Sequence, residues 1–264
     1  MQSRAHSLQK LRDLGGGAYA VEVDGPIPET GPGQFYMLRT ERRWPVLLPR
    51  PFSLYDRGED GSWGSFLVKP IGEGTRAICD LRPGEKLVVT GPLGRTFPDD
   101  IKDPVCIAGG VGLAPFLLLA RSEFAAGRKM RLLFGGRSRE ALSGIEDFQE
   151  IANVFPSTDD GSHGFHGLVT SLLEDLMAKG EVHQGETVFC CGPDPMMHAV
   201  ADLCEQRGLR CFLSLETYMA CGYGVCNGCT VKVKGERFKE WPYSKTCMEG
   251  PVYEACELVH DEGH

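Results

Sequence analysis

Cys221-Gly-Tyr-Gly-Val-Cys226-Asn-Gly-Cys229 is the stretch from which the rest of this sequence can be interpreted, and a fourth cysteine, Cys247, follows it. The spacing C-x4-C-x2-C with a distant fourth cysteine is the plant-type ligand pattern for a [2Fe–2S] cluster. A glycine-rich loop can wrap around two bridged irons because Gly222, Gly224 and Gly228 accept backbone angles that other residues avoid. The pattern therefore predicts that these four cysteines ligate a one-electron iron–sulfur centre.

Two other uses of the cysteines fit the spacing less well. A structural zinc site usually brings two C-x2-C pairs, and only Cys226 and Cys229 form such a pair here. A disulfide pair suits a small secreted domain, which this chain does not resemble. Because a one-electron centre rarely stands alone, we expect the remaining sequence to contain the sites that exchange electrons with it.

Length and composition limit the class of protein. A chain of 264 residues is long enough for two ordinary domains and a small appendage. The net charge of -8 argues against nucleic-acid binding, and no basic patch suits a membrane surface. No apolar run is long enough to span a bilayer, and the N-terminus lacks a signal-peptide core. Eleven cysteines fit a reducing compartment, so we expect a cytoplasmic protein.

The first third of the chain shows short apolar runs separated by Gly/Pro turns. These runs predict a small antiparallel barrel, with strands at 19–23, 34–38, 52–55, 65–68 and 87–89. Arg50-Pro51-Phe52-Ser53 enters one strand, and Lys69-Pro-Ile-Gly72-Glu-Gly74-Thr75 precedes a helix expected at 76–81. Glycines allow close approach of the backbone, Thr75 is expected to cap the helix, and Arg50 could bind the same anion, so this region predicts a phosphate site. Taken singly, an Arg-Pro before a strand is commonly an edge-strand device, and glycines before a helix more often form a plain turn than a ligand loop.

After Pro104, strands alternate with helices. Strands are expected at 105–108, 131–134, 154–157 and 187–190, and helices at 116–125, 145–151, 168–177 and 195–207. This alternation predicts a parallel sheet with ligands at the carboxyl ends of its strands. Gly109-Gly110-Val111-Gly112-Leu-Ala-Pro115 follows the first strand as a candidate pyrophosphate loop, although Pro115 stands where the strict fingerprint has glycine, so a tight turn without a ligand is an equal alternative.

These motifs together resemble the ferredoxin–NADP reductase superfamily. RPFS followed by GEGT resembles its flavin-binding domain, while AGGVGLAP, GGRS and CGPDPMM resemble its three nicotinamide-nucleotide loops. The resemblance implies that FAD is bound by Arg50, Pro51, Phe52, Ser53, Lys69, Gly72, Gly74 and Thr75. It implies that NAD is bound by Gly109, Gly110, Gly112, Pro115, Gly136, Arg137, Asp159, Asp160, Cys191, Gly192, Pro193 and Met196. It assigns Cys191 no catalytic role, because hydride passes directly between nicotinamide and flavin.

The choice between NAD and NADP depends on the segment after the third strand of the alternating half. NADP-preferring relatives usually carry a Ser-Arg pair there, whereas this chain has Asp159 and Asp160. A carboxylate can accept hydrogen bonds from a free ribose hydroxyl and would repel a 2′-phosphate. We therefore expect NADH, with Arg137 as the residue that could reverse this preference. The alternative for the two aspartates is an ordinary solvated turn.

The C-terminal part narrows the resemblance. SLE-x-x-MACG-x-G-x-C-x-x-C, a later cysteine and a Gly-Pro-Val-Tyr stretch resemble the electron-transfer subunits of NAD-dependent, two-subunit dihydroorotate dehydrogenases. This resemblance implies a heterotetramer with an FMN-containing catalytic subunit, since nothing here resembles a dihydroorotate pocket. The loop 235–244, containing Trp241, departs from the usual spacing and concerns partner choice. The alternatives are an NADH-dependent ferredoxin oxidoreductase, sulfite reductase or hydrogenase subunit, and a non-catalytic redox sensor.

The expected architecture is α+β and α/β multidomain. It comprises an antiparallel β-barrel flavin domain (1–100), a Rossmann-like parallel α/β nucleotide domain (101–213) and a small C-terminal [2Fe–2S] domain (214–264). Residues 231–233, 251–254 and Leu258 are expected to form a tiny sheet in the last domain. So small a domain has little core, and metal ligation is expected to supply much of its folding free energy. His260 and His264 are expected to be solvated rather than ligating.

Overall fold

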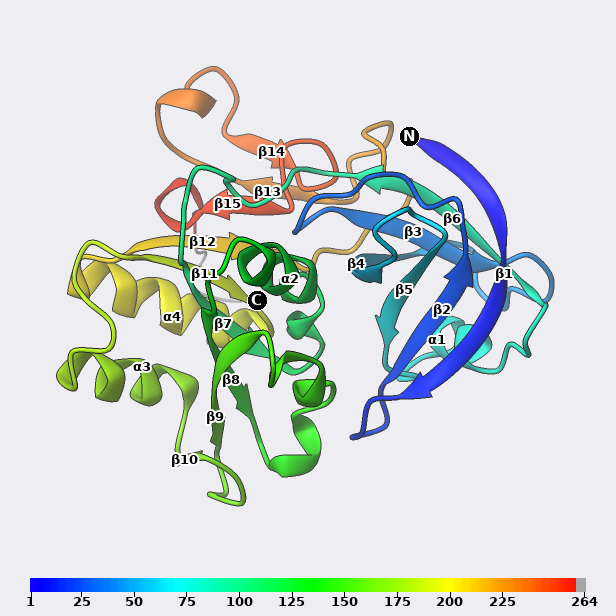
Figure 1. The fold of residues 1–264 in the computed structure, drawn as a ribbon. Helices are drawn as coiled ribbons and strands as arrows, with labels where there is room; N and C mark the ends of the chain where they lie inside the picture. The colour runs from blue at the N-terminus through cyan, green and yellow to red at the C-terminus, as the bar shows by residue number, and fades with distance from the viewer. Residues whose placement is uncertain (260–264) are drawn as a thin grey trace.

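Six antiparallel strands close into a barrel in the computed structural model, which describes residues 1–259 (Figure 1). The barrel order is β1-β2-β5-β4-β3-β6, and the short helix α1 (Glu73–Cys79) packs beside it. Alternate residues of β6 are buried, as a closed barrel requires. The strands are β1 (Gln2–Asp13), β2 (Tyr19–Asp24), β3 (Phe35–Thr40), β4 (Arg50–Arg57), β5 (Trp63–Val68) and β6 (Lys86–Leu93).

The strand β1 was not predicted, although it closes the barrel. It pairs with β2 on one side and with β6 on the other. Only His6 and Leu8 are buried among its twelve residues, so the sequence shows no apolar alternation there. The predicted antiparallel barrel is confirmed. Its closing strand, β1, can be recognised only from its pairing with β2 and β6 in the structure.

The α/β region has a seven-stranded sheet in the order β10-β9-β8-β7-β11-β12-β15. Helix α2 (Phe116–Ala125) covers one face, while α3 (Val169–Ala178) and α4 (Asp194–Arg207) cover the other, as their separate buried clusters show (Figure 1). The parallel sheet is confirmed for β7 (Val105–Gly109), β8 (Met130–Gly136), β9 (Ala152–Thr158), β10 (Phe165–His166), β11 (Thr187–Cys191) and β12 (Arg210–Ser214).

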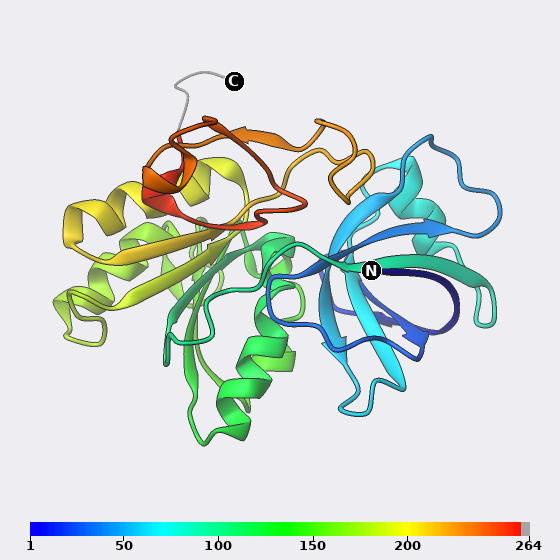
Figure 2. The same ribbon diagram turned by 90° about the horizontal axis from the view of Figure 1, so that it is seen from above.

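The last strand of this sheet corrects the expected C-terminal sheet. β15 (Val252–Glu254) pairs antiparallel with β12, so it belongs to the large sheet. The small sheet consists instead of β13 (Thr230–Lys232) and β14 (Tyr243–Lys245), and Val233 bridges to Leu258 beside it. We call residues 215–251, which run between β12 and β15, the cluster lobe; Figure 2 shows it above the junction of barrel and sheet. His260 and His264 lie outside the described residues.

The helix expected at 145–151 is present only as a 3-10 turn, η3 (Ile145–Phe148). Within this turn, the Asp147 carboxylate accepts hydrogen bonds from Arg12 and Tyr55 of the barrel. These tertiary contacts fix a short turn where the apolar spacing indicated a longer helix. The other 3-10 turns are η1 (Gly110–Leu113), η2 (Arg139–Ala141), η4 (Glu236–Phe238) and η5 (Ala255–Glu257).

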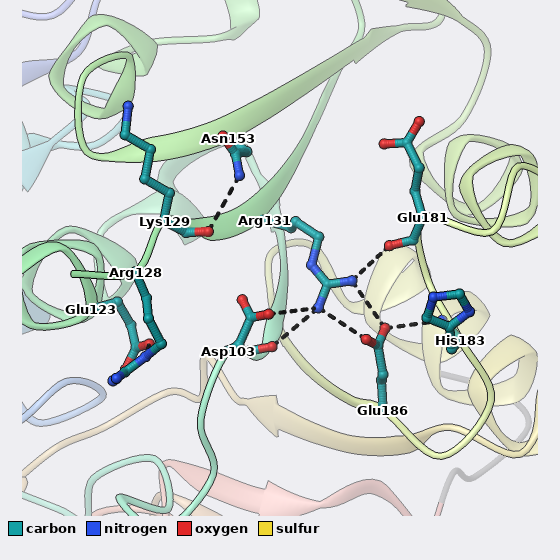
Figure 3. Close-up of polar contacts among 9 residues, drawn as sticks. All are labelled: Asp103, Glu123, Arg128, Lys129, Arg131, Asn153, Glu181, His183 and Glu186. Carbon is teal, nitrogen blue, oxygen red and sulfur yellow. Dashed lines mark hydrogen bonds and ion pairs between the residues drawn. The ribbon is translucent and has the colours of Figure 1, made fainter. Parts of the chain in front are cut away.

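Ion pairs gather at the amino ends of the parallel strands (Figure 3). Arg131 at the start of β8 donates to the Glu181 carbonyl at 2.7 Å, to Glu186 Oε2 at 3.1 Å and to Asp103 Oδ2 at 3.4 Å. Its side chain is only 14% exposed, so these acceptors replace most of its water. These hydrogen bonds connect the loops at the amino ends of the strands. A ligand would bind at the opposite edge of the sheet, at the carboxyl ends of the strands.

Candidate functional site

The four predicted cluster ligands lie in two pairs. Cys221 and Cys226 bring their sulfur atoms to 3.3 Å, and the Cys226 N–H donates to Cys221 Sγ at 3.4 Å. Burial acts to raise the pKa of Cys221, but N–H groups of Cys226, Tyr223 and Val225 outweigh it and lower the pKa to about 6. The loop therefore stabilises a thiolate, which is the form that ligates iron.

The second pair, Cys229 and Cys247, is more deeply buried. Both side chains are about 2% exposed and pack with Phe35, Met37, Leu93 and Met219. Burial, followed by a hydrogen bond with Cys229, raises the pKa of Cys247 to about 12 in the metal-free protein. This pair faces the barrel, whereas the first pair lies in the more exposed loop.

The paired cysteines are compatible with a two-iron cluster. Each iron of a [2Fe–2S] cluster takes two thiolates, so two separate pairs suit it. The donors present are therefore suited to a two-iron cluster.

Glycines bring the cluster loop close to its neighbours. Gly222 and Gly224 have φ of +81° and +88°, as predicted, but Gly228 is not in the left-handed region. A Cβ on Gly222 would lie 2.5 Å from Met37 Cγ of β3, so only glycine permits this approach. The loop is thereby seated directly on the barrel.

A cleft of about 690 Å³ lies between the barrel, the sheet and the start of the cluster lobe. The predicted flavin motif supplies one wall, and loops after β7 and β11 supply another. The structure thus brings most of the predicted residues to one site. Those that line the cleft are Arg50, Pro51, Phe52, Ser53, Lys69, Thr75, Gly110, Pro115, Cys191, Gly192 and Pro193.

The beginning of α1 differs from the prediction. The helix starts at Glu73, with Gly72 as its N-cap, so Thr75 is the third helical residue rather than the cap. The Thr75 hydroxyl reaches back and accepts from the Gly72 N–H at 3.0 Å. Gly74 is buried, and a Cβ there would lie 2.9 Å from the Trp44 ring. Gly72 and Gly74 therefore shape the turn beside the cleft without lining it.

Several predicted nucleotide residues pack the loops together. A Cβ on Gly109 would lie 2.6 Å from Met196 Sδ, and one on Gly112 would lie 2.4 Å from the Cys191 carbonyl oxygen. These glycines let the loops after β7 and β11 touch, which explains their presence without a ligand. Cys191 is buried, and that burial raises its pKa strongly, so its thiol is neutral at physiological pH.

Asp159, Asp160, Gly136 and Arg137 lie outside the cleft, at the carboxyl ends of β8 and β9. The N–H groups of Asp159 and Asp160 donate to the carbonyls of Gly136 and Arg137, at 3.0 and 3.2 Å. Asp160 accepts from the hydroxyl and N–H of Ser162, which lowers its pKa. Both aspartates are exposed, and the Asp160 carboxylate is engaged in the turn by Ser162.

The sequence did not indicate that the start of the cluster lobe forms a cleft wall. Leu215, Glu216, Thr217, Tyr218 and Met219 all line it. Enclosure by the cleft walls, and then repulsion from Asp194, raises the pKa of Glu216. The Thr217 hydroxyl is buried without a partner among the described residues. The motif Ser214-Leu-Glu216 is the sequence signal for this wall, although its resemblance indicates only the cluster domain.

Comparison with known families defines the class of protein. Residues 106–202 match the oxidoreductase NAD-binding domain, and residues 216–259 match the iron-sulfur cluster binding domain of dihydroorotate dehydrogenase B. The barrel, the parallel sheet and the cysteine loop therefore belong to an NAD-binding oxidoreductase subunit with an iron–sulfur domain. Among described residues, no helix has the length and apolarity needed to cross a bilayer.

Similar proteins narrow this class to one family. The dihydroorotate dehydrogenase B (NAD(+)) electron transfer subunit of Caldanaerobacter subterraneus subsp. tengcongensis is 36% identical, covering 86% of this chain and 87% of that protein. The subunit of the same description from Clostridium acetobutylicum is 35% identical and covers 92% of each chain. This chain belongs to the family of dihydroorotate dehydrogenase B electron transfer subunits.

Solved structures support the fold alone. A structure titled for the NADH-dependent reduced ferredoxin-NADP oxidoreductase has a TM-score of 0.84 at 24% identity, covering 97% of this chain and 90% of that chain. Phthalate dioxygenase reductase has a TM-score of 0.64 at 16% identity, covering 88% and 87%. Both share the arrangement of barrel and nucleotide-binding sheet.

Proposed function

We propose that this chain carries electrons between an FMN-containing dihydroorotate dehydrogenase catalytic subunit and NAD⁺, through a [2Fe–2S] cluster and FAD, within a heterotetramer. One observation carries the proposal. Phe35 and Met219 line the cleft and also pack against Cys229 and Cys247, so a flavin in the cleft and a cluster on the loop would be separated by one layer of side chains. Family membership supports the choice of partner.

The cleft residues suit FAD. When bound, FAD supplies the conversion between a two-electron hydride and single electrons. Arg50 and Lys69 bring positive charge to the wall where the pyrophosphate would lie, and Ser53 offers a hydroxyl to the ring. Arg50 donates to the Leu48 carbonyl at 2.7 Å, which orients its guanidinium along the cleft wall.

On the opposite wall, Cys191, Gly192 and Pro193 would orient the nicotinamide. Because the Cys191 thiol is neutral, it would neither act as a nucleophile toward the nicotinamide nor repel it by charge, which suits a positioning role. Asp159 supports NADH as the preferred donor, because its exposed carboxylate can accept from a ribose hydroxyl and would repel a 2′-phosphate. The divisions 1–100, 101–213 and 214–264 remain our proposal for the three functional domains.

The partner is proposed to dock over the cluster loop. Large apolar side chains are exposed around a hollow of about 740 Å³ there. They are Tyr223, Val225, Trp241, Tyr243 and Met248. Such a patch is typical of an interaction surface, and its position over the loop would bring a partner's redox centre near Cys221 and Cys226.

The test is a coupled electron-transfer assay. Purified protein, reconstituted anaerobically with iron, sulfide and FAD, should reduce ferricyanide with NADH, and NADPH should be at least about tenfold poorer. Dihydroorotate should reduce NAD⁺ only after the catalytic subunit is added. Failure with ferricyanide overturns the nucleotide-to-flavin part of the proposal. Reduction of a ferredoxin, without coupling to dihydroorotate, would favour the ferredoxin oxidoreductase alternative.

A further inference from the structure

The barrel and the α/β region meet across a shared apolar cluster. Leu14, Tyr55 and Leu67 of the barrel side pack with Phe116 and Leu117 of α2. Apolar contact of this kind holds two surfaces together but is non-directional. The relative angle of the two regions therefore depends on directional contacts at the same boundary.

The first directional contact joins β4 to α2. Arg121 donates from Nε to Asp56 Oδ1 at 2.8 Å and from a terminal nitrogen to Oδ2 at 2.7 Å. The Asp56 side chain is only 8% exposed. A two-pronged pair of this kind fixes the orientation of both side chains as well as their distance.

The second contact joins β1 and β4 to the turn η3. Asp147 accepts two hydrogen bonds from Arg12, at 2.9 and 2.8 Å, and a third from the Tyr55 hydroxyl at 2.7 Å. Tyr55 is completely buried. We call Asp56, Arg121, Asp147, Tyr55 and Arg12 the domain clamp. Two separate attachment points resist rotation about either one.

The clamp is built on the segments that form the cleft. β4 carries the motif Arg50–Ser53 at its start and the clamp residues Tyr55 and Asp56 just beyond it. Helix α2, which carries Arg121, begins directly after the cleft residue Pro115. The two walls of the cleft are therefore linked through short, regular segments, and a shift at the clamp moves one wall relative to the other.

Ion pairs of this kind add little to stability. Exposed or half-exposed pairs contribute about 0–1 kcal/mol. Replacing a whole buried pair by apolar residues is often neutral for stability, whereas removing one partner leaves a buried charge and is destabilising. Hydride transfer is far more sensitive, since a displacement of about 1 Å can cost about 100-fold in rate. The clamp is thus better suited to setting a geometry than to holding the protein together.

We propose that the domain clamp positions the nicotinamide against the flavin for hydride transfer, an inference that rests on the proposed function. In that step the C4–H bond of NADH breaks and an N5–H bond forms on the flavin. The nicotinamide loses two electrons, and the flavin gains them with the hydrogen nucleus. The clamp residues touch neither reactant and act through the two walls that hold them.

The experiment compares Arg121→Gln with Arg121→Lys and with a matched control, Arg210→Gln. Arg210 makes a two-pronged pair with Glu254, at 2.8 and 3.0 Å, which joins β12 to β15 within one sheet rather than the barrel to the sheet. Arg210 is about as exposed as Arg121 (50% against 52%), while Glu254 is more exposed than Asp56 (29% against 8%). Stopped-flow absorbance measures flavin reduction by NADH in the reconstituted protein. The long-wavelength charge-transfer band reports nicotinamide–flavin contact, and FAD content and Tm are measured in parallel.

Arg121→Gln is expected to lower the rate of flavin reduction about 10- to 100-fold and to weaken the charge-transfer band, whereas Arg210→Gln should change neither. Because Arg121→Gln leaves the buried Asp56 carboxylate without its cation, Tm serves only to check that the variant is folded. Arg121→Lys should restore part of the rate. If Arg121→Gln does not fold, Tyr55→Phe, which removes only the hydroxyl bonded to Asp147, gives the same comparison. Equal rates in Arg121→Gln and Arg210→Gln overturn the inference. A wild-type flavin that NADH does not reduce overturns the proposed function instead.

Discussion

The body of this protein, formed by the barrel and the large sheet, and the cluster lobe are stabilised in different ways. The body contains three clusters of buried apolar side chains, which include Phe66, Phe134 and Phe189. Within the described residues no apolar cluster is confined to the lobe, because Met219, Cys229 and Cys247 pack on the barrel and Val233 packs on the sheet. The body is stabilised by its own packing, whereas the lobe depends on its neighbours and on metal ligation.

The largest expected effect comes from the core of the body. Phe189 is fully buried, stacks on Phe97 at 4.6 Å and meets Phe212 edge-on at 5.7 Å. Phe189→Ala should lower the free energy of unfolding by about 3–5 kcal/mol and impair the flavin and nucleotide sites together. Chemical denaturation measures this loss. A change below about 1 kcal/mol, comparable to that of a surface variant, would contradict the comparison.

The second prediction concerns the lobe alone. Cys226→Ser removes one of the four proposed ligands, so the iron–sulfur absorbance and electron transfer to the catalytic subunit should be lost. NADH-dependent ferricyanide reduction should persist, because the body retains its packing. Hydrogen exchange should show faster exchange in 215–251 than in β7 and β11. If Cys226→Ser also lost FAD, the body would depend on the lobe for its folded structure, and the comparison would be wrong.

The smallest expected effect is a pH dependence in the body. Hydrogen bonds from Arg128, at 2.5 and 2.9 Å, lower the pKa of Glu123 (Figure 3). The ionised Glu123 therefore stabilises the folded protein fully at pH values above the ordinary glutamate pKa. This contribution is lost as the pH falls through the lowered pKa that Glu123 has in the folded state. Glu123→Gln should reduce stability by about 1 kcal/mol at pH 7, and the difference from wild type should vanish in acid. A constant difference down to the acid transition would exclude this origin.

Much of the fold could be predicted because local patterns and tertiary structure agree. Helix α2 has the predicted bounds. β7 is buried throughout, β11 is buried after Thr187, and a glycine follows each strand. By contrast, β1 buries few residues, and Ile145–Phe148 is held as a short turn by contacts from the barrel. Such contacts depend on residues far away in the sequence.

The same division applies to the site. Cys221, Cys226, Cys229 and Cys247 could be proposed as cluster ligands from their spacing, which is local in the sequence, and the structure places them in two pairs. The cleft wall at Glu216 and Tyr218 could not, because it depends on where β12 and β15 direct the lobe. The contact between Asp56 and Arg121 likewise spans a boundary that no local pattern reveals.

The pairing of β12 with β15 makes the iron–sulfur lobe an insertion within a hairpin. Ser214 and Val252 are register partners, so the chain leaves the sheet and returns to it at the same point. A tight turn across this pair would restore an uninterrupted two-domain scaffold. Exchange of the lobe would therefore leave the strand order of the sheet unchanged, but it would remove the cleft wall that residues 215–219 form.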